Sequence, residues 1–86
     1  GGWQADERAS PLARLKAMDN NGLLYRTLQA WFHHNVQPLA TSKALFIHRN
    51  TLEYRLNRIS ELTGLELGNF DDRLLLYLAL QLDEQR

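Results

Sequence analysis

Apolar residues recur at intervals of three or four along most of the chain, a spacing that places them on one face of an α-helix. The longest such stripe runs through 49–63 and comprises Leu52, Leu56, Ile59 and then Leu62 or Thr63. Shorter stripes predict further helices over 11–18, 23–34, 38–45 and 70–82. The pattern therefore predicts an all-α fold of about five short helices.

Capping residues and helix breakers separate these stripes. Ser10 stands before a proline, which predicts an N-cap followed by proline in the first helical turn. Gly64 is expected to end the long helix in a left-handed conformation, and Asn69 to cap the last helix. Residues 1–9 carry no periodic apolar stripe, so we expect a tail or linker there and one domain over 10–86.

Several large side chains on the shorter helices are expected to face the core. They are Leu12, Leu15, Met18, Leu24, Leu28, Trp31, Phe32, Leu39 and Leu45. Phe46 stands where a turn between two helices often has glycine, so we expect this turn to avoid the left-handed region and the ring to point inward. The last helix is apolar almost all round, which leaves open whether it is buried in the core or shares a face with a second molecule.

A helix-turn-helix unit is predicted over 38–63, where a short helix, a tight turn and a longer helix follow one another. Outside its apolar stripe, the longer helix carries polar side chains that can address base edges in a DNA groove. The candidates for base readout are Arg49, Asn50, Glu53, Tyr54 and Asn57. The candidates for phosphate contact are Thr41, Ser42, Lys43, His48, Thr51, Arg55 and Arg58.

Structural roles remain open for several of these residues. Arg49 and Glu53 could pair across one helical turn, and Arg55 and Arg58 could lay their aliphatic stems along the margin of the core. Thr51 could do no more than satisfy the start of its helix. His48 is the expected N-cap, at a helix end whose free N–H groups would also suit a phosphate.

Charge is distributed unevenly along the chain, although the formal net charge is zero. Residues 1–22 have a net charge of zero. Residues 23–60 carry five cationic side chains and one acid, Glu53, which gives a net charge of +4. Residues 61–86 have a net charge of −4. A polyanion would be drawn to the middle segment and repelled by the last one. Ordinary surface scatter could produce the same asymmetry.

Length and composition exclude several classes of function. A chain of 86 residues without cysteine holds one small core and no disulfide or zinc–cysteine site. His33 and His34 are neighbours on a helix and point about 100° apart, so they cannot grip one metal ion together. Nor does any run approach the ~20 apolar residues of a membrane span. We expect no metal, no cofactor in this domain, no membrane partner and a cytoplasmic location. The chain begins with Gly1, which indicates a processed chain or a fragment.

The run FIHRNTLEYRLNRISELTG, followed by an apolar terminal helix, resembles the C-terminal helix-turn-helix domain of the purine catabolism regulator family of bacterial transcription factors. The most specific part is 48–52, with Tyr54, Arg55 and Leu56 after it, and the resemblance covers 12–82. Within the family it looks most like the regulators of sugar-diacid genes. The resemblance implies the output domain of an activator that controls uptake and metabolism of glucarate, galactarate or glycerate.

The partners that follow are double-stranded DNA, a second copy in the full-length protein, and an upstream effector-binding domain of the parent chain. The alternative is a helical protein-interaction or dimerisation module, docking through the last helix without DNA contact. An enzyme is not expected, because the histidines, serines and acids form no pattern of nucleophile, base and orienting group.

Overall fold

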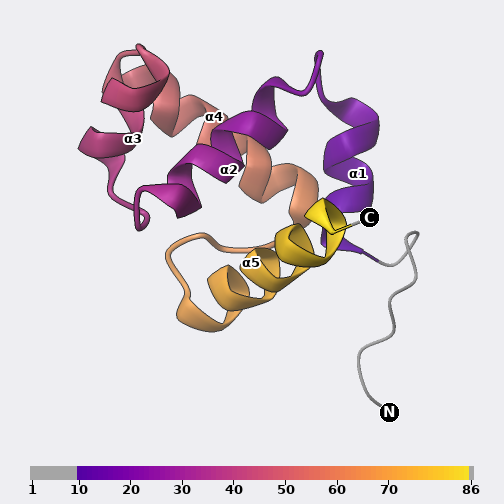
Figure 1. Ribbon diagram of the computed structural model, residues 1–86. Helices are drawn as coiled ribbons and strands as arrows, with labels where there is room; N and C mark the ends of the chain where they lie inside the picture. Colours follow the sequence, from indigo (N-terminus) through magenta and orange to yellow (C-terminus); the bar gives the residue numbers. More distant parts are fainter. Residues whose placement is uncertain (1–9, 86) are drawn as a thin grey trace.

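The computed structural model describes residues 10–85 and contains five α-helices and no strand in that range (Figure 1). The helices are α1 (Pro11–Met18), α2 (Leu23–His33), α3 (Pro38–Leu45), α4 (Arg49–Thr63) and α5 (Phe70–Glu84). The predicted all-α fold class is confirmed. The tail expected at 1–9 lies outside the described residues.

Helix boundaries follow the capping chemistry that the sequence predicts. The Ser10 hydroxyl accepts from the N–H of Leu12 at 3.2 Å, and the Asn69 side chain accepts from the N–H of Asp72 at 3.0 Å. Gly64 ends α4 with φ of 74°, the left-handed conformation that only glycine adopts without cost. These local signals therefore set the ends of α1, α4 and α5.

Asp19 caps α2 from the preceding turn. Its two carboxylate oxygens accept from the N–H groups of Leu24 and Tyr25, at 2.8 and 2.9 Å. Gly22, the residue directly before α2, has no side chain and so cannot cap it. Asp19 therefore follows the end of α1 and supplies the cap of α2.

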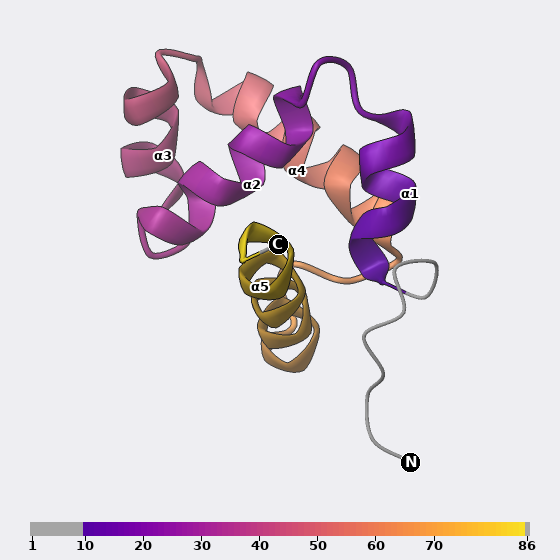
Figure 2. The same cartoon turned by 45° about the vertical axis from the view of Figure 1, so that its right-hand side comes forward.

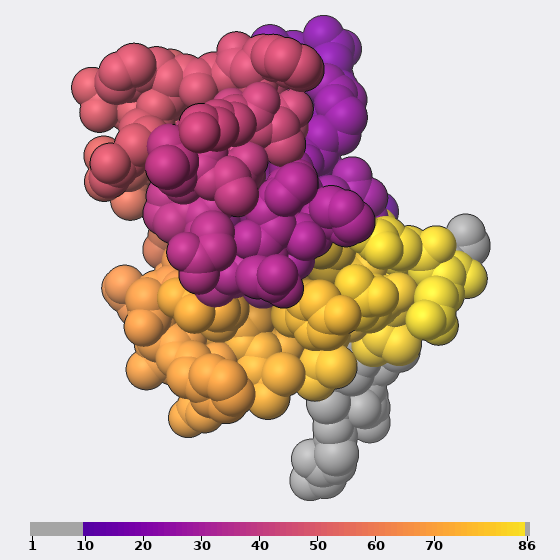
Figure 3. All heavy atoms as spheres, turned by 60° about the vertical axis from the view of Figure 1, so that its left-hand side comes forward, coloured from indigo at the N-terminus to yellow at the C-terminus, as the bar shows by residue number. Residues whose placement is uncertain are grey.

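The core lies where α4 packs against α1, α2 and α3, and α5 packs against α1 (Figure 2). Its buried apolar side chains include Leu12, Leu15, Leu28, Trp31, Ile59, Leu62, Leu76 and Leu80. In the space-filling view, α2 separates α3 from α5 (Figure 3). α3 and α5 therefore occupy different parts of the face in this view. No helix among residues 10–85 is long and apolar enough to cross a membrane.

The prediction of core positions is wrong for two residues: Met18 is 58% exposed and Leu39 is 56% exposed. Leu39 and Leu45 stand six positions apart, so their side chains point about 120° apart around the helix, and only Leu45 is half-buried. The buried residues of α3 are instead Thr41 and Ser42. Small side chains at these positions permit α3 to pack closely against its neighbours α2 and α4.

The expectation for Phe46 is also wrong: it has φ of 56° and ψ of 44°, in the left-handed region, and its ring is 94% exposed. The backbone explains this. The N–H of Phe46 donates to the carbonyl of Lys43, and the N–H of Ile47 donates to that of Ser42. This pair of bonds is a Schellman motif, which requires a left-handed residue and takes its apolar contact from the next one, the half-buried Ile47.

Candidate nucleic-acid interface

The side of α4 opposite its core stripe is open to solvent. Leu52 and Ile59 are buried on the inner side, at 1% and 0% exposure. The outer residues are all exposed, and they are Arg49, Asn50, Glu53, Tyr54 and Asn57. α5 does not cover them. All five predicted base-reading residues are therefore placed where a ligand could reach them.

The start of α4 is capped by an imidazole. Nδ1 of His48 accepts from the N–H of Asn50 at 3.0 Å, which confirms His48 as the N-cap. The first turn of α4 carries no acidic side chain, and the helix dipole places partial positive charge there. This end of the helix can therefore receive an anion without competition from a neighbouring carboxylate.

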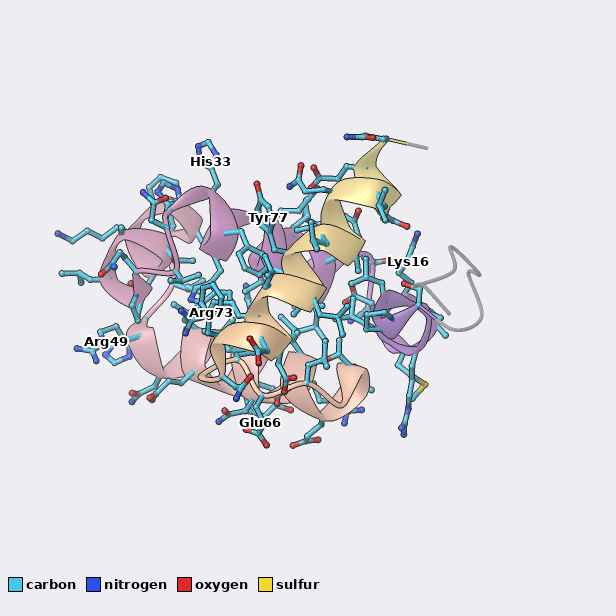
Figure 4. All side chains as sticks on the ribbon, turned by 90° about the horizontal axis from the view of Figure 1, so that it is seen from below. Lys16, His33, Arg49, Glu66, Arg73 and Tyr77 are labelled. Carbon is cyan, nitrogen blue, oxygen red and sulfur yellow. The ribbon has the colours of Figure 1, made fainter. Side chains whose placement is uncertain are left out.

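Lys43, in the last turn of α3, and Thr51, in the first turn of α4, are exposed together with His48. Neither Lys43 nor Arg49 forms an ion pair within residues 10–85. Figure 4 shows Arg49 pointing outward, away from α5, which carries Arg73 and Tyr77. The last turn of α3 and the first residue of α4 thus present two cationic side chains that are available to a polyanion.

Thr41 and Ser42 do not fit their predicted role in phosphate contact. They are 0% and 3% exposed, and their hydroxyls donate to the carbonyls of Gln37 and Leu39, at 2.7 and 2.9 Å. A buried hydroxyl that already donates within its own helix cannot reach a phosphate without rearrangement of α3. Both residues act as packing residues of α3 and are removed from the candidate interface.

Arg55 and Arg58 are half-buried and are held by protein partners. Nη1 of Arg55 donates to Oγ1 of Thr27 in α2 at 3.3 Å, and Nη1 of Arg58 lies 3.0 Å from Oε2 of Glu61. Their stems lie at the margin of the core, which fits the structural alternative. Thr27, buried at 1% exposure, was not recognised from the sequence, because nothing in its local pattern indicates a contact with α4.

Comparisons with known proteins identify the family of this chain. The sequence pattern of the PucR C-terminal helix-turn-helix domain matches residues 24–82. The chain belongs to the PucR family. The carbohydrate diacid regulator of Escherichia coli is 87% identical over 86 residues, which are all of this chain and 22% of that protein.

Two further relatives are less similar to this chain. The proline-responsive transcriptional activator PutR of Bacillus subtilis is 39% identical over 77 residues, covering 87% of this chain and 19% of the relative. The purine catabolism regulatory protein of the same species is 36% identical over 67 residues, covering 78% of this chain and 12% of the relative. The family consists of regulators, so the expectation of a non-enzyme is confirmed.

This chain therefore spans about a fifth of the length of the curated relatives that it matches most fully. No solved structure matches it. Membership of the PucR family shows a helix-turn-helix domain of transcription regulators, and α3 and α4 are the two helices that the sequence predicts as that unit.

Proposed function

We propose that this chain binds double-stranded DNA sequence-specifically, with α4 in the major groove. The supporting observation is the row of five polar side chains on the uncovered side of α4, four of which can form hydrogen bonds specific for a base. Lys43 in the last turn of α3 adds a second exposed cation to Arg49, which begins this row. Of the acidic residues in the last segment, Glu61 lies in α4, and the others lie in α5 and the loop before it.

Base readout is assigned to the start and middle of α4. Arg49 offers two parallel donors to guanine, Asn50 can pair with adenine in the same bidentate way, and Glu53 can accept from cytosine. Tyr54, 71% exposed, can contact a phosphate or stack on a base. Asn57, one turn further along, is the outermost candidate.

Phosphate contact is assigned to Lys43, His48 and Thr51, which surround the N-terminus of α4. Arg58 joins them if its guanidinium exchanges Glu61 for a phosphate, a change that needs only a side-chain rotation at a half-exposed site. Arg55 donates a hydrogen bond to Thr27 and is a weaker candidate for phosphate contact. Its position favours stabilising the packing of α4 on α2 over contact with the DNA backbone.

The biological role follows from the relative that is 87% identical. We propose that this chain is the output domain of a bacterial activator of sugar-diacid genes, for glucarate, galactarate or glycerate. The parent protein would sense its effector in an upstream domain and act as a homodimer in the cytoplasm. Its two half-sites would then lie about 34–36 Å apart, one helical turn of DNA.

A salt titration of binding tests this function. The isolated chain is titrated by fluorescence anisotropy against promoter fragments of sugar-diacid genes, at several salt concentrations. Log affinity should fall linearly with log salt, at about −0.9 for each phosphate neutralised. Asn50→Ala should cost about 1–3 kcal/mol and relax discrimination at one base position.

The phosphate contacts are tested in the same titration. Arg58→Ala should flatten the salt dependence by about one unit and weaken all sequences equally. Arg14→Ala, which removes an exposed cation from α1, is the matched control and should change neither quantity. Affinity that is indifferent to salt and to Asn50→Ala would exclude DNA binding and leave the protein-interaction module as the function.

A further inference from the structure

α5 carries a row of exposed apolar side chains along its outer side. Phe70, Leu74, Leu78 and Leu82 are 71%, 45%, 50% and 44% exposed, and their spacing of four residues places them along one side of the helix. We call these four residues the outer stripe. The opposite side of α5 is buried in the core through Leu76, Ala79 and Leu80.

A continuous apolar row on a small domain indicates a surface that another protein covers. The outer stripe is extended on one side by Tyr77, whose ring packs edge-on against Phe32 at 5.2 Å between centroids. A groove between α2 and α5 begins there and is lined by Phe32, Tyr77 and Leu80, together with polar side chains of both helices. One partner protein could therefore contact both the outer stripe and the adjoining groove.

Acidic side chains border the outer stripe at both ends. Asp71 and Glu84 are exposed near the first and last turns of α5. Arg73 does not neutralise them, because its guanidinium lies over the ring of Trp31 and Nε donates to the carbonyl of Leu67 (Figure 4). The surface is therefore apolar in the middle and negative at its rim, which repels DNA.

The same charges disfavour a second copy of this chain as the occupant. Two α5 helices related by a twofold axis would meet either parallel or antiparallel. Acids stand at both ends of α5, so either direction brings carboxylates together, and like charges facing each other weaken an interface. The partner that fits has an apolar surface with lysine or arginine at its edge.

The preceding part of the parent protein is placed to be this partner. The matching family domain is C-terminal, and the chain spans about a fifth of the relatives named above, so the rest of such a protein comes before it. α1, through which the described chain enters the fold, packs against α5, with Nζ of Lys16 2.7 Å from Oδ1 of Asp83. An upstream domain would join the fold beside α5.

We propose that the outer stripe of α5 docks onto the upstream region of the parent chain, against an apolar surface rimmed by basic side chains. This contact would link the upstream region to the helix-turn-helix unit through the core that α5 shares with α1 and α4. It does not depend on the proposed DNA function, because it uses none of the residues assigned to DNA.

Hydrogen–deuterium exchange of a full-length protein tests this docking. In the Escherichia coli regulator, the matching 86 residues are replaced by this chain. The resulting protein keeps the upstream region of that regulator. Exchange of the amides in α5 is compared between this full-length protein and the 86-residue chain. Docking should slow exchange in the full-length protein by about tenfold or more, since a bound partner stabilises the folded helix.

The variants are chosen to separate contact from folding. Leu74→Glu with Leu78→Glu should abolish the added protection, whereas Met18→Glu, on an exposed apolar residue of α1, should keep it. Asp71→Lys with Glu84→Lys should reduce the protection through repulsion of the basic rim. Circular dichroism checks that each variant retains its helices.

Three outcomes would overturn the proposal. The first is equal exchange of α5 in the two wild-type proteins. The second is protection that also arises in the 86-residue chain as its concentration rises, together with a dimer in sedimentation, which would assign the stripe to a second copy. The third is stronger protection after the charge reversal. DNA affinity, measured separately on the same proteins, can fail without changing any of these results.

Discussion

The phenolic oxygen of Tyr25 in α2 donates a 2.6 Å hydrogen bond to Oδ2 of Asp83 in α5. The other oxygen of the same carboxylate accepts from Nζ of Lys16 in α1, at 2.7 Å. One side chain near the C-terminus therefore joins three helices. Burial, followed by the hydrogen bond to Asp83, raises the pKa of Tyr25 above its ordinary value of 10.0.

Replacing Asp83 should destabilise the fold in a manner that depends on pH. Burial alone would raise the pKa of Asp83, but the hydrogen bonds from Lys16 and Tyr25 outweigh it and hold the pKa below 3.8. A lowered pKa means that the carboxylate stabilises the fold above the unfolded value and that this contribution is lost as pH falls through the folded value. Asp83→Asn should therefore cost about 1–2 kcal/mol at neutral pH and progressively less under acid conditions.

Urea unfolding of the wild-type and Asp83→Asn proteins, at neutral pH and at several pH values below 3.8, measures the difference in their stability. Glu66→Gln is the control, because the Glu66 carboxylate makes no hydrogen bond within residues 10–85 and should change neither the midpoint nor its pH dependence. An Asp83→Asn deficit that stays constant from neutral to acid pH would contradict the assigned role of the carboxylate.

Phe46→Gly should stabilise the domain. The ring is 94% exposed and contributes little burial, whereas a non-glycine residue in the left-handed region costs about 1 kcal/mol. Phe46→Val should destabilise it, because a β-branched side chain tolerates this conformation worse. Thermal unfolding compares the three proteins. Equal losses in both variants would mean that the ring makes contacts that its exposure does not reveal.

His48→Ala should lower stability by about 1 kcal/mol, because it removes the acceptor that caps α4. His48→Asn keeps a capping acceptor and should restore most of the loss. The urea midpoint measures the cap, and DNA affinity measures the second role assigned to His48. A stable His48→Asn protein with weakened, salt-dependent DNA binding would support phosphate contact, whereas His48→Ala unfolding at the wild-type midpoint would exclude the cap.

Glu61→Gln should strengthen DNA binding by about two- to threefold, because it frees Arg58 from its 3.0 Å ion pair and removes one negative charge. Stability should change by only a few tenths of a kcal/mol, as for other exposed pairs one turn apart. Glu66→Gln removes the same charge without releasing an arginine, so it serves as the matched control. Equal gains in the two variants would show that Arg58 takes no part.

The predicted helix boundaries agree with the structure because the capping signals act within a few residues. Ser10, Gly64 and Asn69 each satisfy or terminate the backbone of their own helix, whatever packs around them. The stripe of α4 was equally readable, since fifteen residues are long enough for a period of 3.6 to be distinguished. These features and the identity of the helix-turn-helix unit could be predicted from the sequence.

α3 shows why the rest could not be predicted. Its eight residues make barely two turns, too few for a period to identify the inner side, so Leu39 was placed inside and Thr41 and Ser42 outside. The conformation of Phe46 differs from the prediction because the hydrogen bonds of the turn require a left-handed residue, although phenylalanine disfavours that conformation. The contact of Arg55 with Thr27 joins positions 28 residues apart and left no local signal.

The sequence by itself determined the number and order of the helices, which family the chain resembles and which side of α4 is polar, because these depend on neighbours along the chain. The tertiary structure alone decided that Thr41 and Ser42 are buried, that Asp83 joins three helices and that the outer stripe of α5 is left uncovered. Those outcomes depend on how whole helices pack, and the packing angle of a helix is set by contacts between residues far apart in the chain.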